Sequence, residues 1–340
     1  TIMTIFKLFL TNFLLLFFLM QQALSIELNI YSNRSASLLE PFTKEYEKEF
    51  SIKFNILHAP KGLAQRLKSE GKNSPADVIL TVDISRLSEL SDMGLLQNIN
   101  SSIIDKNVPT NLRDKNKKWI SLSTRARVIG ISKERIKPNQ IQRIEDLANP
   151  KYKGKICTRA GSHSYNRALL SSIVAHKGEK KAEEWAKGLV ANFARKPKGN
   201  DRAQAKGIFS GECDIILINT YYFALMKFNE KHPEQKEWAN STQLIFFNQQ
   251  DIGQHINVSG AGIAKFSKNK EEATKFIEWL TKPKAQKIYA DINYEYPVNS
   301  VVKLEGNIME WGNFIADKLP ISELAKHSKT SQMIIDRVGW

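Results

Sequence analysis

Short apolar runs alternate with amphipathic stretches in the part of the chain that follows residue 25. Each apolar run has the character of a buried strand, and each amphipathic stretch repeats its apolar positions at helical spacing. Gly94 follows the last of these helices, where a left-handed cap would end it. Repeated strand–helix–strand order predicts a parallel α/β sheet. The predicted strands are 27–31, 53–58 and 77–81, and the predicted helices are 38–50, 63–69 and 84–93.

The same alternation resumes after Arg127 and predicts a second α/β lobe. Its predicted strands are 128–131, 155–158 and 215–219, and two of its helices begin near Tyr165 and Lys180.

The chain then returns to the first lobe. Residues 257–264 have the small side chains and strand propensity of a crossing segment, and the helices 270–280 and 284–292 follow it. With a first crossing near 124–130, this pattern predicts a hinge between two lobes. We expect a discontinuous first lobe and an inserted second lobe. The first would comprise 26–126 and 262–340, and the second 127–261.

The N-terminal segment has the pattern of an export signal. Lys7 precedes an apolar run over 8–20, and Ala23 and Ser25 are small residues at the two positions that a signal peptidase reads. The run is shorter than the roughly 20 residues that a membrane span needs. We therefore predict that residues 1–25 are a signal peptide and that a soluble protein is exported to the periplasm.

Composition narrows the class further. The chain has 340 residues, of which 42% are hydrophobic and 25% are charged, so it can form two folded cores. The net charge of +15 suits an anionic partner, but the basic residues are spread along the chain. Because aromatic and basic residues are not interleaved as in nucleic-acid-binding surfaces, we expect a solvated basic surface and no nucleic-acid partner.

The two cysteines, Cys157 and Cys213, each lie beside a predicted strand of the second lobe. An oxidising compartment favours their pairing, whereas two buried free thiols are the alternative. We predict a disulfide that ties neighbouring strands and stabilises the fold by about 4 kcal/mol.

Tyrosines follow the strands of the second lobe at predicted helix starts. Tyr221 and Tyr222 come directly after 215–219, and Tyr165 begins the helix after 155–158. Ligands of such folds bind beyond the carboxyl ends of strands and at helix N-termini. A phenol ionises near pH 10, so a phenolate at neutral pH needs a strong cation, and Fe³⁺ is a natural candidate. Ordinary aromatic packing is the alternative interpretation.

Other candidate chemistry is weaker. The six histidines show no metal-pair spacing, and there is no Cys-x-x-Cys, so a zinc site is not expected. His163 lies between Ser162 and Ser164, which would suit a secreted hydrolase, but adjacent residues on one loop rarely face each other. Polar capping of a helix is the simpler interpretation. For Arg34, Arg125 and Arg159, a structural ion pair is the alternative to a role in the site.

Several motifs together resemble the periplasmic ferric-iron-binding proteins of ABC transporters (solute-binding protein family 1), above all their tyrosine-rich, cyanobacterial-type branch. The resemblance covers nearly the whole chain after residue 25, although each motif is weak alone. The motifs are IYSNR at 30–34, SPADVILTVD at 74–83, STRARVI at 123–129, KIC at 155–157, SYN at 164–166, GECD at 211–214, NTYY at 219–222, HINVSGAG at 255–262 and YPVN at 296–299.

The resemblance implies an α/β, two-lobed type II binding-protein fold with two crossover strands. It also implies a monomeric, non-enzymatic protein that captures Fe³⁺ in the cleft, with or without a synergistic anion, and delivers it to an ABC permease. In that family the tyrosines matching Tyr165, Tyr221 and Tyr222 bind iron. The arginine matching Arg127 supports the anionic ligands by hydrogen bonding, and Arg34 is a secondary candidate for that role.

The sequence departs from the family pattern in the first lobe. Relatives follow the first strand with Arg-His-Tyr, whereas Ser35 and Ala36 follow Arg34 here, and Val82 stands where other relatives have Glu. Both first-lobe ligand options are therefore missing. Either water, a carbonate-like anion or a chelator completes the iron site, or the cleft binds a different anionic or small solute. We predict that iron affinity depends on an anion held by Arg127.

Overall fold

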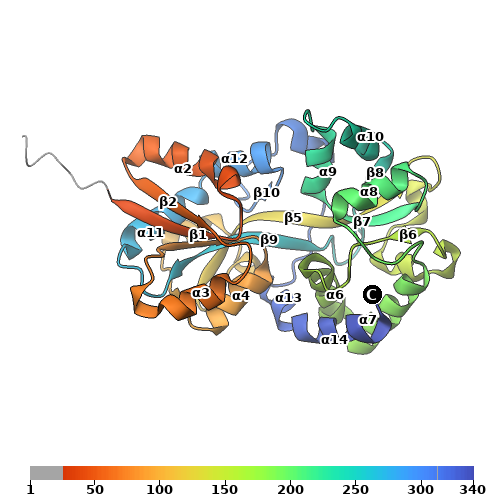
Figure 1. Cartoon of the computed structure of the whole chain (residues 1–340), viewed down its shortest axis with the longest axis horizontal. Helices are drawn as coiled ribbons and strands as arrows, with labels where there is room; N and C mark the ends of the chain where they lie inside the picture. Colours follow the sequence, from red (N-terminus) through yellow and green to blue (C-terminus); the bar gives the residue numbers. More distant parts are fainter. Residues whose placement is uncertain (1–25, 312) are drawn as a thin grey trace, which may run out of the picture.

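The computed structural model describes residues 26–311 and 313–340, and the signal peptide expected at 1–25 lies outside them. In the described part of the chain, no helix is long and apolar enough to cross a membrane. The structure is α/β, with helices packed around strands that form one continuous sheet (Figure 1). The strand order along the sheet is β2-β1-β3-β9-β5-β7-β6.

The N-terminal part of the chain forms the predicted strand–helix alternation. β1 pairs in parallel with β2 and β3, as repeated strand–helix–strand units require. The prediction for residues 53–58 matches β2 to the residue, and Gly94 has the positive φ of 67° that a left-handed cap needs. The elements are β1 (Glu27–Ser32), α2 (Ala36–Phe50), β2 (Lys53–His58), α3 (Leu63–Glu70), β3 (Val78–Thr81), α4 (Ile84–Asp92), β4 (Leu96–Gln97) and α5 (Ser102–Asn107).

A second group of elements surrounds β7, which lies between β5 and β6. β6 and β7 are parallel, and their apolar side chains are fully buried between helices on both faces. The elements of this group are β6 (Ile156–Cys157), α6 (Ser164–Lys177), α7 (Glu179–Ala191), α8 (Asp201–Phe209), β7 (Ile215–Asn219), α9 (Thr220–Lys227), α10 (Glu234–Asn240) and β8 (Thr242–Ile245).

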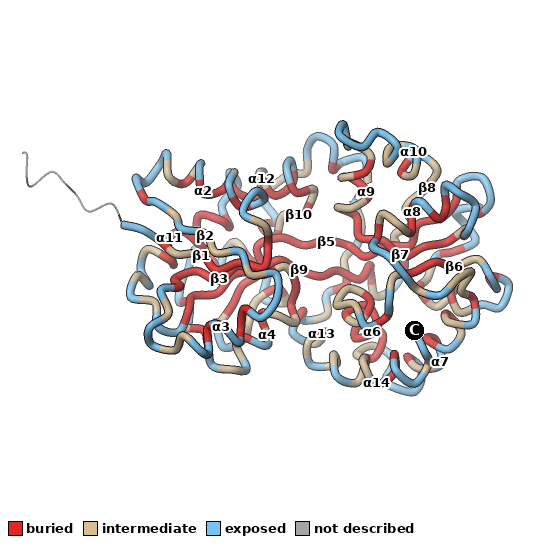
Figure 2. Tube along the Cα trace, viewed as in Figure 1, coloured by how far each residue is buried: buried red, intermediate tan, exposed pale blue. Residues whose placement is uncertain are grey.

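One long strand, β5 (Trp119–Ser132), joins the two groups and is buried along its whole length (Figure 2). Its first part pairs with β9 as far as Ala126, opposite Ile256. From Arg127, opposite Asn219, it pairs with β7. The change of partner falls within the predicted first crossing at 124–130. We propose that it marks the boundary between the first and second lobes.

We propose that the chain returns to the first lobe earlier than expected. β9 (Ile256–Ala264) pairs with β3, β4 and β5 in the first lobe, because its small residues allow close approach of neighbouring strands. In this proposal the segment 246–255 makes the second crossing, and the expected boundary at 261 falls inside β9. The elements that follow β9 are α11 (Lys270–Leu280), α12 (Pro283–Asn293) and β10 (Tyr296–Pro297).

The last helix departs from the expectation that residues 262–340 all belong to the first lobe, whereas α13 packs between the lobes, with Leu324 in the first-lobe cluster. α13 (Ser322–Lys326) and α14 (Ser328–Val338) lie beside α6, and α14 also contacts α7 (Figure 1). Ile334, Ile335 and Trp340 are buried in the hydrophobic cluster of the second lobe. The amphipathic face of α14 finds its apolar partner there, so we place this helix in the second lobe.

Candidate metal centre

The structure brings the three tyrosines of the sequence analysis together. Tyr165 lies in the first turn of α6, and Tyr221 and Tyr222 lie in the first turn of α9, directly after β7. The hydroxyl oxygens of Tyr165 and Tyr221 are 2.9 Å apart. The ring centroids of Tyr221 and Tyr222 are 4.4 Å apart. Both helices therefore present phenol groups to one place at the edge of the second lobe.

These tyrosines line a cleft of about 310 Å³ between the lobes. Each of the three side chains remains partly exposed. The wall formed by the first lobe offers no phenol, imidazole or free carboxylate among the residues that line the cleft. The lining residues are Asn33, Arg34, Ser35, Leu38, Val82, Arg125, Tyr165, Tyr221, Tyr222, Leu225, Ile292, Asn293 and Glu295.

Burial and neighbouring positive charge have opposite effects on the pKa values of the tyrosine phenols. Burial raises the pKa of Tyr165, and the positive charge of Arg125 partly offsets that rise. Burial, together with the two neighbouring phenols, raises the pKa of Tyr221 well above its ordinary value. Both groups are therefore protonated at neutral pH while the site is empty. A strong cation is needed to displace their protons.

Arg125 is a candidate residue that the sequence analysis did not identify as part of the site. Its side chain lines the cleft, is only 2% exposed, and its Cζ lies 5.7 Å from the centroid of the Tyr165 ring. One guanidinium nitrogen donates to Ser259 Oγ at 3.1 Å, but its Nε and second terminal nitrogen are buried without a partner in the described structure. No carboxylate among the described residues forms an ion pair with it, contrary to the alternative of a structural ion pair.

Arg127 does not line the cleft, in contrast to its expected contact with an anion. It is buried behind the tyrosines, where its Nε donates to Asn166 at 2.8 Å. A terminal nitrogen of Arg127 donates to Asn219 at 3.0 Å and to Asp201 at 3.1 Å. Asn166 follows Tyr165, and Asn219 precedes the helix of Tyr221. The guanidinium therefore ties the two tyrosine-bearing segments to each other.

Arg34 lines the first-lobe wall, but its charge is neutralised. It forms a 2.6 Å ion pair with Glu295 and donates to Ser259 Oγ at 2.7 Å. Ser123 also donates to Glu295. Burial acts to raise the pKa of Glu295, but the charges of Arg34 and Arg125, together with the hydrogen bonds from Ser123 and Arg34, lower that pKa. Arg34 is consequently a weaker anion partner than Arg125, and Glu295 is already occupied.

His163 caps the helix of Tyr165. Its Nδ1 accepts a hydrogen bond from the Tyr165 backbone N–H, as the capping interpretation expected. Burial and the charges of Arg159 and Arg127 lower the pKa of His163 to about 4, so it is neutral at pH 7. In the described residues, no cluster of three or more His, Cys, Asp or Glu side chains could hold a metal ion.

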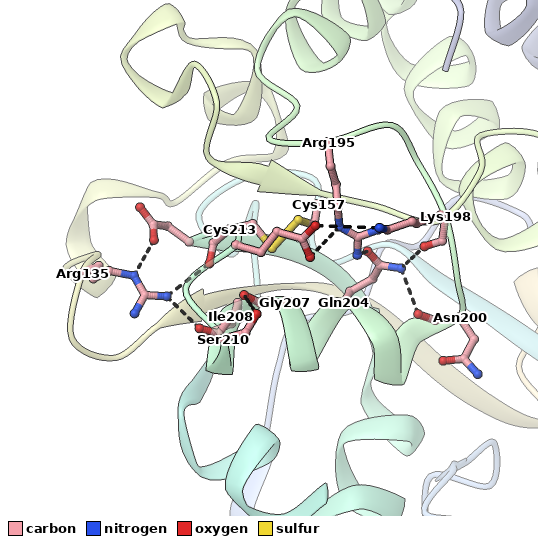
Figure 3. Close-up of a disulfide and its surroundings, with 12 residues drawn as sticks. Arg135, Cys157, Arg195, Lys198, Asn200, Gln204, Gly207, Ile208, Ser210 and Cys213 are labelled. Carbon is pink, nitrogen blue, oxygen red and sulfur yellow. Dashed lines mark hydrogen bonds and ion pairs between the residues drawn. A yellow bond between two sulfur atoms is a disulfide. The ribbon is translucent and has the colours of Figure 1, made fainter.

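The Cys157–Cys213 disulfide is present, with Cα atoms 5.9 Å apart (Figure 3). It joins β6 to the segment that precedes β7, as predicted. The intervening 157–213 segment carries Tyr165 on α6 and Asp201 at the start of α8. The disulfide therefore closes the loop that positions one phenol and the carboxylate partner of Arg127.

Comparison with known proteins identifies the family. The profile of the bacterial extracellular solute-binding protein family matches residues 73–316. Iron uptake protein A1 of Synechocystis is 40% identical over 92% of this chain and 87% of its own length. The chain belongs to this solute-binding protein family.

Solved structures of family members resemble this solute-binding protein over almost their whole length. The Trichodesmium protein IdiA (FutA), solved in complex with iron and citrate, is 41% identical with a TM-score of 0.89 and covers 92% of this chain and 99% of its own. Ferric iron-binding protein A of Mannheimia haemolytica, in an open conformation, is 43% identical with a TM-score of 0.87 and covers 93% and 99%. The two-lobed type II binding-protein fold expected from the sequence is confirmed.

Proposed function

We propose that this solute-binding protein captures ferric iron in the periplasm and delivers it to the permease of an ABC transporter. The observation that carries the proposal is the 2.9 Å approach of the Tyr165 and Tyr221 hydroxyls, with the tilted ring of Tyr222 against that of Tyr221 at the cleft. Phenolate oxygens are hard ligands that suit Fe³⁺. The iron-uptake and ferric-iron-binding names of the similar proteins support the same cargo.

In this proposal the ion binds to the second lobe through Tyr165, Tyr221 and Tyr222. Each phenol releases its proton as it binds the metal. Ser35 and Val82 line the opposite wall and supply no metal-binding oxygen or nitrogen comparable to a phenolate, imidazole or carboxylate. Three phenolates leave an octahedral ion short of ligands. An exogenous ligand or water therefore completes the coordination.

Arg125 is the proposed partner of an exogenous anion, in place of Arg127. Arg125 lines the cleft and has two unpartnered guanidinium nitrogens. Arg127 does not line the cleft; two of its nitrogens bond to Asn166, Asn219 and Asp201, and the third is buried without a partner in the described structure. A guanidinium binds a carboxylate or carbonate through paired hydrogen bonds that an ammonium group cannot reproduce. Arg127 instead acts as a positioning residue for the two tyrosine-bearing segments.

The protein performs no chemical step on its cargo in this proposal. Similar proteins are binding proteins, and the cleft supplies binding groups for an ion and its accompanying ligand. We further propose that the protein works as a monomer whose partner is the permease. Closing the lobes over the ion presents one defined shape to that partner.

Purification without chelators tests the cargo. The expected product contains about one iron per chain and shows a visible phenolate-to-iron charge-transfer band, which the Tyr165→Phe/Tyr221→Phe variant loses. Tyr152→Phe is the matched control, because its hydroxyl donates to Gln140 O within the second lobe and does not line the cleft. A colourless protein whose iron content is independent of the tyrosines would contradict the proposal and favour another anionic or small solute.

A further inference from the structure

The helix that carries Tyr221 and Tyr222 contacts the first lobe at its far end. α9 has eight residues, so it is roughly 12 Å long. Phe228 caps its C-terminal end and stacks on Tyr294, which caps α12, with ring centroids 5.7 Å apart and an interplanar angle of 26°. α12 packs in the hydrophobic cluster of the first lobe, on the same side of the sheet as α9 (Figure 1). One end of α9 therefore presents the phenols, and the other end contacts the first lobe.

Helical spacing links this contact to the orientation of the phenols. Tyr221, Leu225 and Phe228 are spaced i, i+4, i+7, which places them along one face of α9. Tyr221 and Leu225 line the cleft, so this face is turned toward the first lobe. A rotation of α9 about its own axis would displace the Tyr221 hydroxyl and the Phe228 ring together. A contact that fixes Phe228 therefore also fixes the orientation of Tyr221.

Trp311 extends the contact from the segment that follows β10. Its ring lies edge-on to the rings of Phe223 and Phe228, with centroid distances of 5.9 and 6.2 Å. It packs both against the second-lobe cluster that contains Phe223 and against a smaller cluster around α12 and β10. Lys227 forms an ion pair with Glu310 nearby, but both side chains are partly exposed, so this pair adds little. Aromatic packing is consequently the main interaction between α9 and this segment.

The backbone of Tyr294 shows independently that its ring is held in place. Its φ is 53°, in the left-handed region that residues with bulky side chains rarely adopt. Glycine is the usual residue in this conformation after a helix, because it has no Cβ to clash. Such backbone strain persists where the surrounding structure fixes the residue, and it is typical of functional sites. The contact of Tyr294 with Phe228 provides that fixation.

We propose that Tyr294 and Trp311 are positioning residues for the iron site. With Phe223 and Phe228 they form an aromatic clasp that holds the last turn of α9 and so orients the phenols at its first turn. The inference rests on the proposed function. The aromatic clasp lets the first lobe support metal ligands that the second lobe supplies. A lobe movement that separates Tyr294 from Phe228 would remove this support and lower the affinity for iron.

Tyr294→Gly tests the aromatic clasp with little expected effect on folding. The variant loses the ring contact, but glycine suits the left-handed backbone, so the two effects on stability oppose each other and the melting temperature should change little. Iron affinity, measured by chelator competition, should fall about 10-fold. The phenolate-to-iron charge-transfer band should also weaken for each iron bound, because the phenols are less well oriented.

Trp311 provides a second variant and a rescue. Trp311→Ala should lower iron affinity to a similar extent, and Trp311→Phe should restore most of it because an aromatic ring remains. Trp238→Ala is the matched control, since Trp238 on α10 packs against the same second-lobe cluster. This control should lower the melting temperature and change iron affinity less than about 2-fold.

The outcomes separate failure of the inference from failure of the function. Wild-type affinity and an unchanged band in both Tyr294→Gly and Trp311→Ala would overturn the aromatic clasp and leave the tyrosine site intact. An equal loss of affinity in Trp238→Ala would also overturn it, because general loosening of the second lobe would then explain the effect. Wild-type protein that binds no iron, or binds it without a tyrosine-dependent band, overturns the proposed function itself.

Discussion

The two walls of the cleft differ in how their polar groups are satisfied. On the second lobe, the cleft-lining Tyr165 and Tyr221 bond to each other. Arg127 behind them bonds to Asn166, Asn219 and Asp201, although its remaining terminal nitrogen has no partner in the described structure. On the first lobe, Asn33 and Asn293 keep buried atoms without partners in the described structure.

This difference indicates that the two walls of the cleft have different roles in binding. A wall whose groups already bond to each other is held in a fixed shape, which suits a site that must bind a small ion with defined geometry. The side-chain conformations of a wall with unsatisfied polar groups depend on which ligand enters the cleft. We infer that the second lobe holds the ion and that the first lobe contacts the ligand that accompanies it.

Removing the hydrogen bonds of Arg127 behind the second-lobe wall has the largest expected effect on stability and iron affinity. Arg127→Met leaves the buried Asp201 with the Arg159 guanidinium at 3.1 Å and loses both asparagine contacts. Disrupting a buried ion pair costs roughly 3–5 kcal/mol of unfolding free energy. We expect a lower melting temperature and an iron affinity reduced by about 100-fold, measured by calorimetry and chelator competition.

The anion dependence of that variant distinguishes the two arginines. Because Arg125 borders the cleft and Arg127 does not, Arg127→Met keeps the ratio of affinities with and without anion, whereas Arg125→Met loses it. Arg143→Met, which breaks a surface pair with Asp251, controls for loss of a charge. Loss of anion dependence in the Arg127 variant alone would restore the role expected from the sequence.

Acidification tests the phenols without a mutation. The raised pKa values of Tyr165 and Tyr221 keep both protonated in the empty site, and metal binding must release those protons. Iron affinity therefore falls as pH falls, by roughly 1,000-fold per pH unit if all three phenol ligands release a proton and by roughly 100-fold if only Tyr165 and Tyr221 do. Titration at a fixed free concentration of ferric ion in weak buffer measures directly how many protons are released for each ion bound. Release of fewer than one proton per ion would show that the phenols are not the ligands.

Adding metal-binding side chains to the first lobe should allow both walls of the cleft to coordinate the ion. Ser35 precedes α2 and lines the cleft, and Ala36 is the first residue of that helix. The Ser35→His/Ala36→Tyr variant should bind iron about 10-fold more tightly without citrate, because each new ligand replaces water. It should also depend less on citrate. Ser69→His, on α3, is the control, and an unchanged citrate requirement would argue that these positions do not reach the ion.

Much of the fold could be predicted from the sequence because most of its strands are short apolar runs between amphipathic helices. The predictions for 215–219 and 270–280 match β7 and α11 to the residue. β5 was harder, since only 128–131 looks like a continuous apolar strand. Its earlier part contains the polar Ser123 and Arg125, which are buried because they bond across the sheet and at the cleft. Side-chain pattern cannot reveal such pairing.

The site could be predicted on one wall only. Tyr165 and Tyr221 follow strand ends, where sheet topology itself gathers residues. Arg125 and Arg127 lie two apart on one strand and are equivalent in the sequence pattern, so only the positions of Asn166 and Asp201 separate their environments. Asn293 has no signal at all, because an unsatisfied carboxamide differs from a satisfied one only in its three-dimensional surroundings.

The change of partner along β5 also determines how the cleft would empty. A rotation of the lobes would pivot between Ala126 and Arg127, where pairing passes from β9 to β7. Groups beside a pivot sweep short arcs, and those at the rim, such as Leu38 and Ile292, sweep long ones. Unloading would then proceed from the outside inward. The exogenous ligand would first lose its contacts with the first-lobe wall, and the ion would then leave the tyrosine cluster, which moves little.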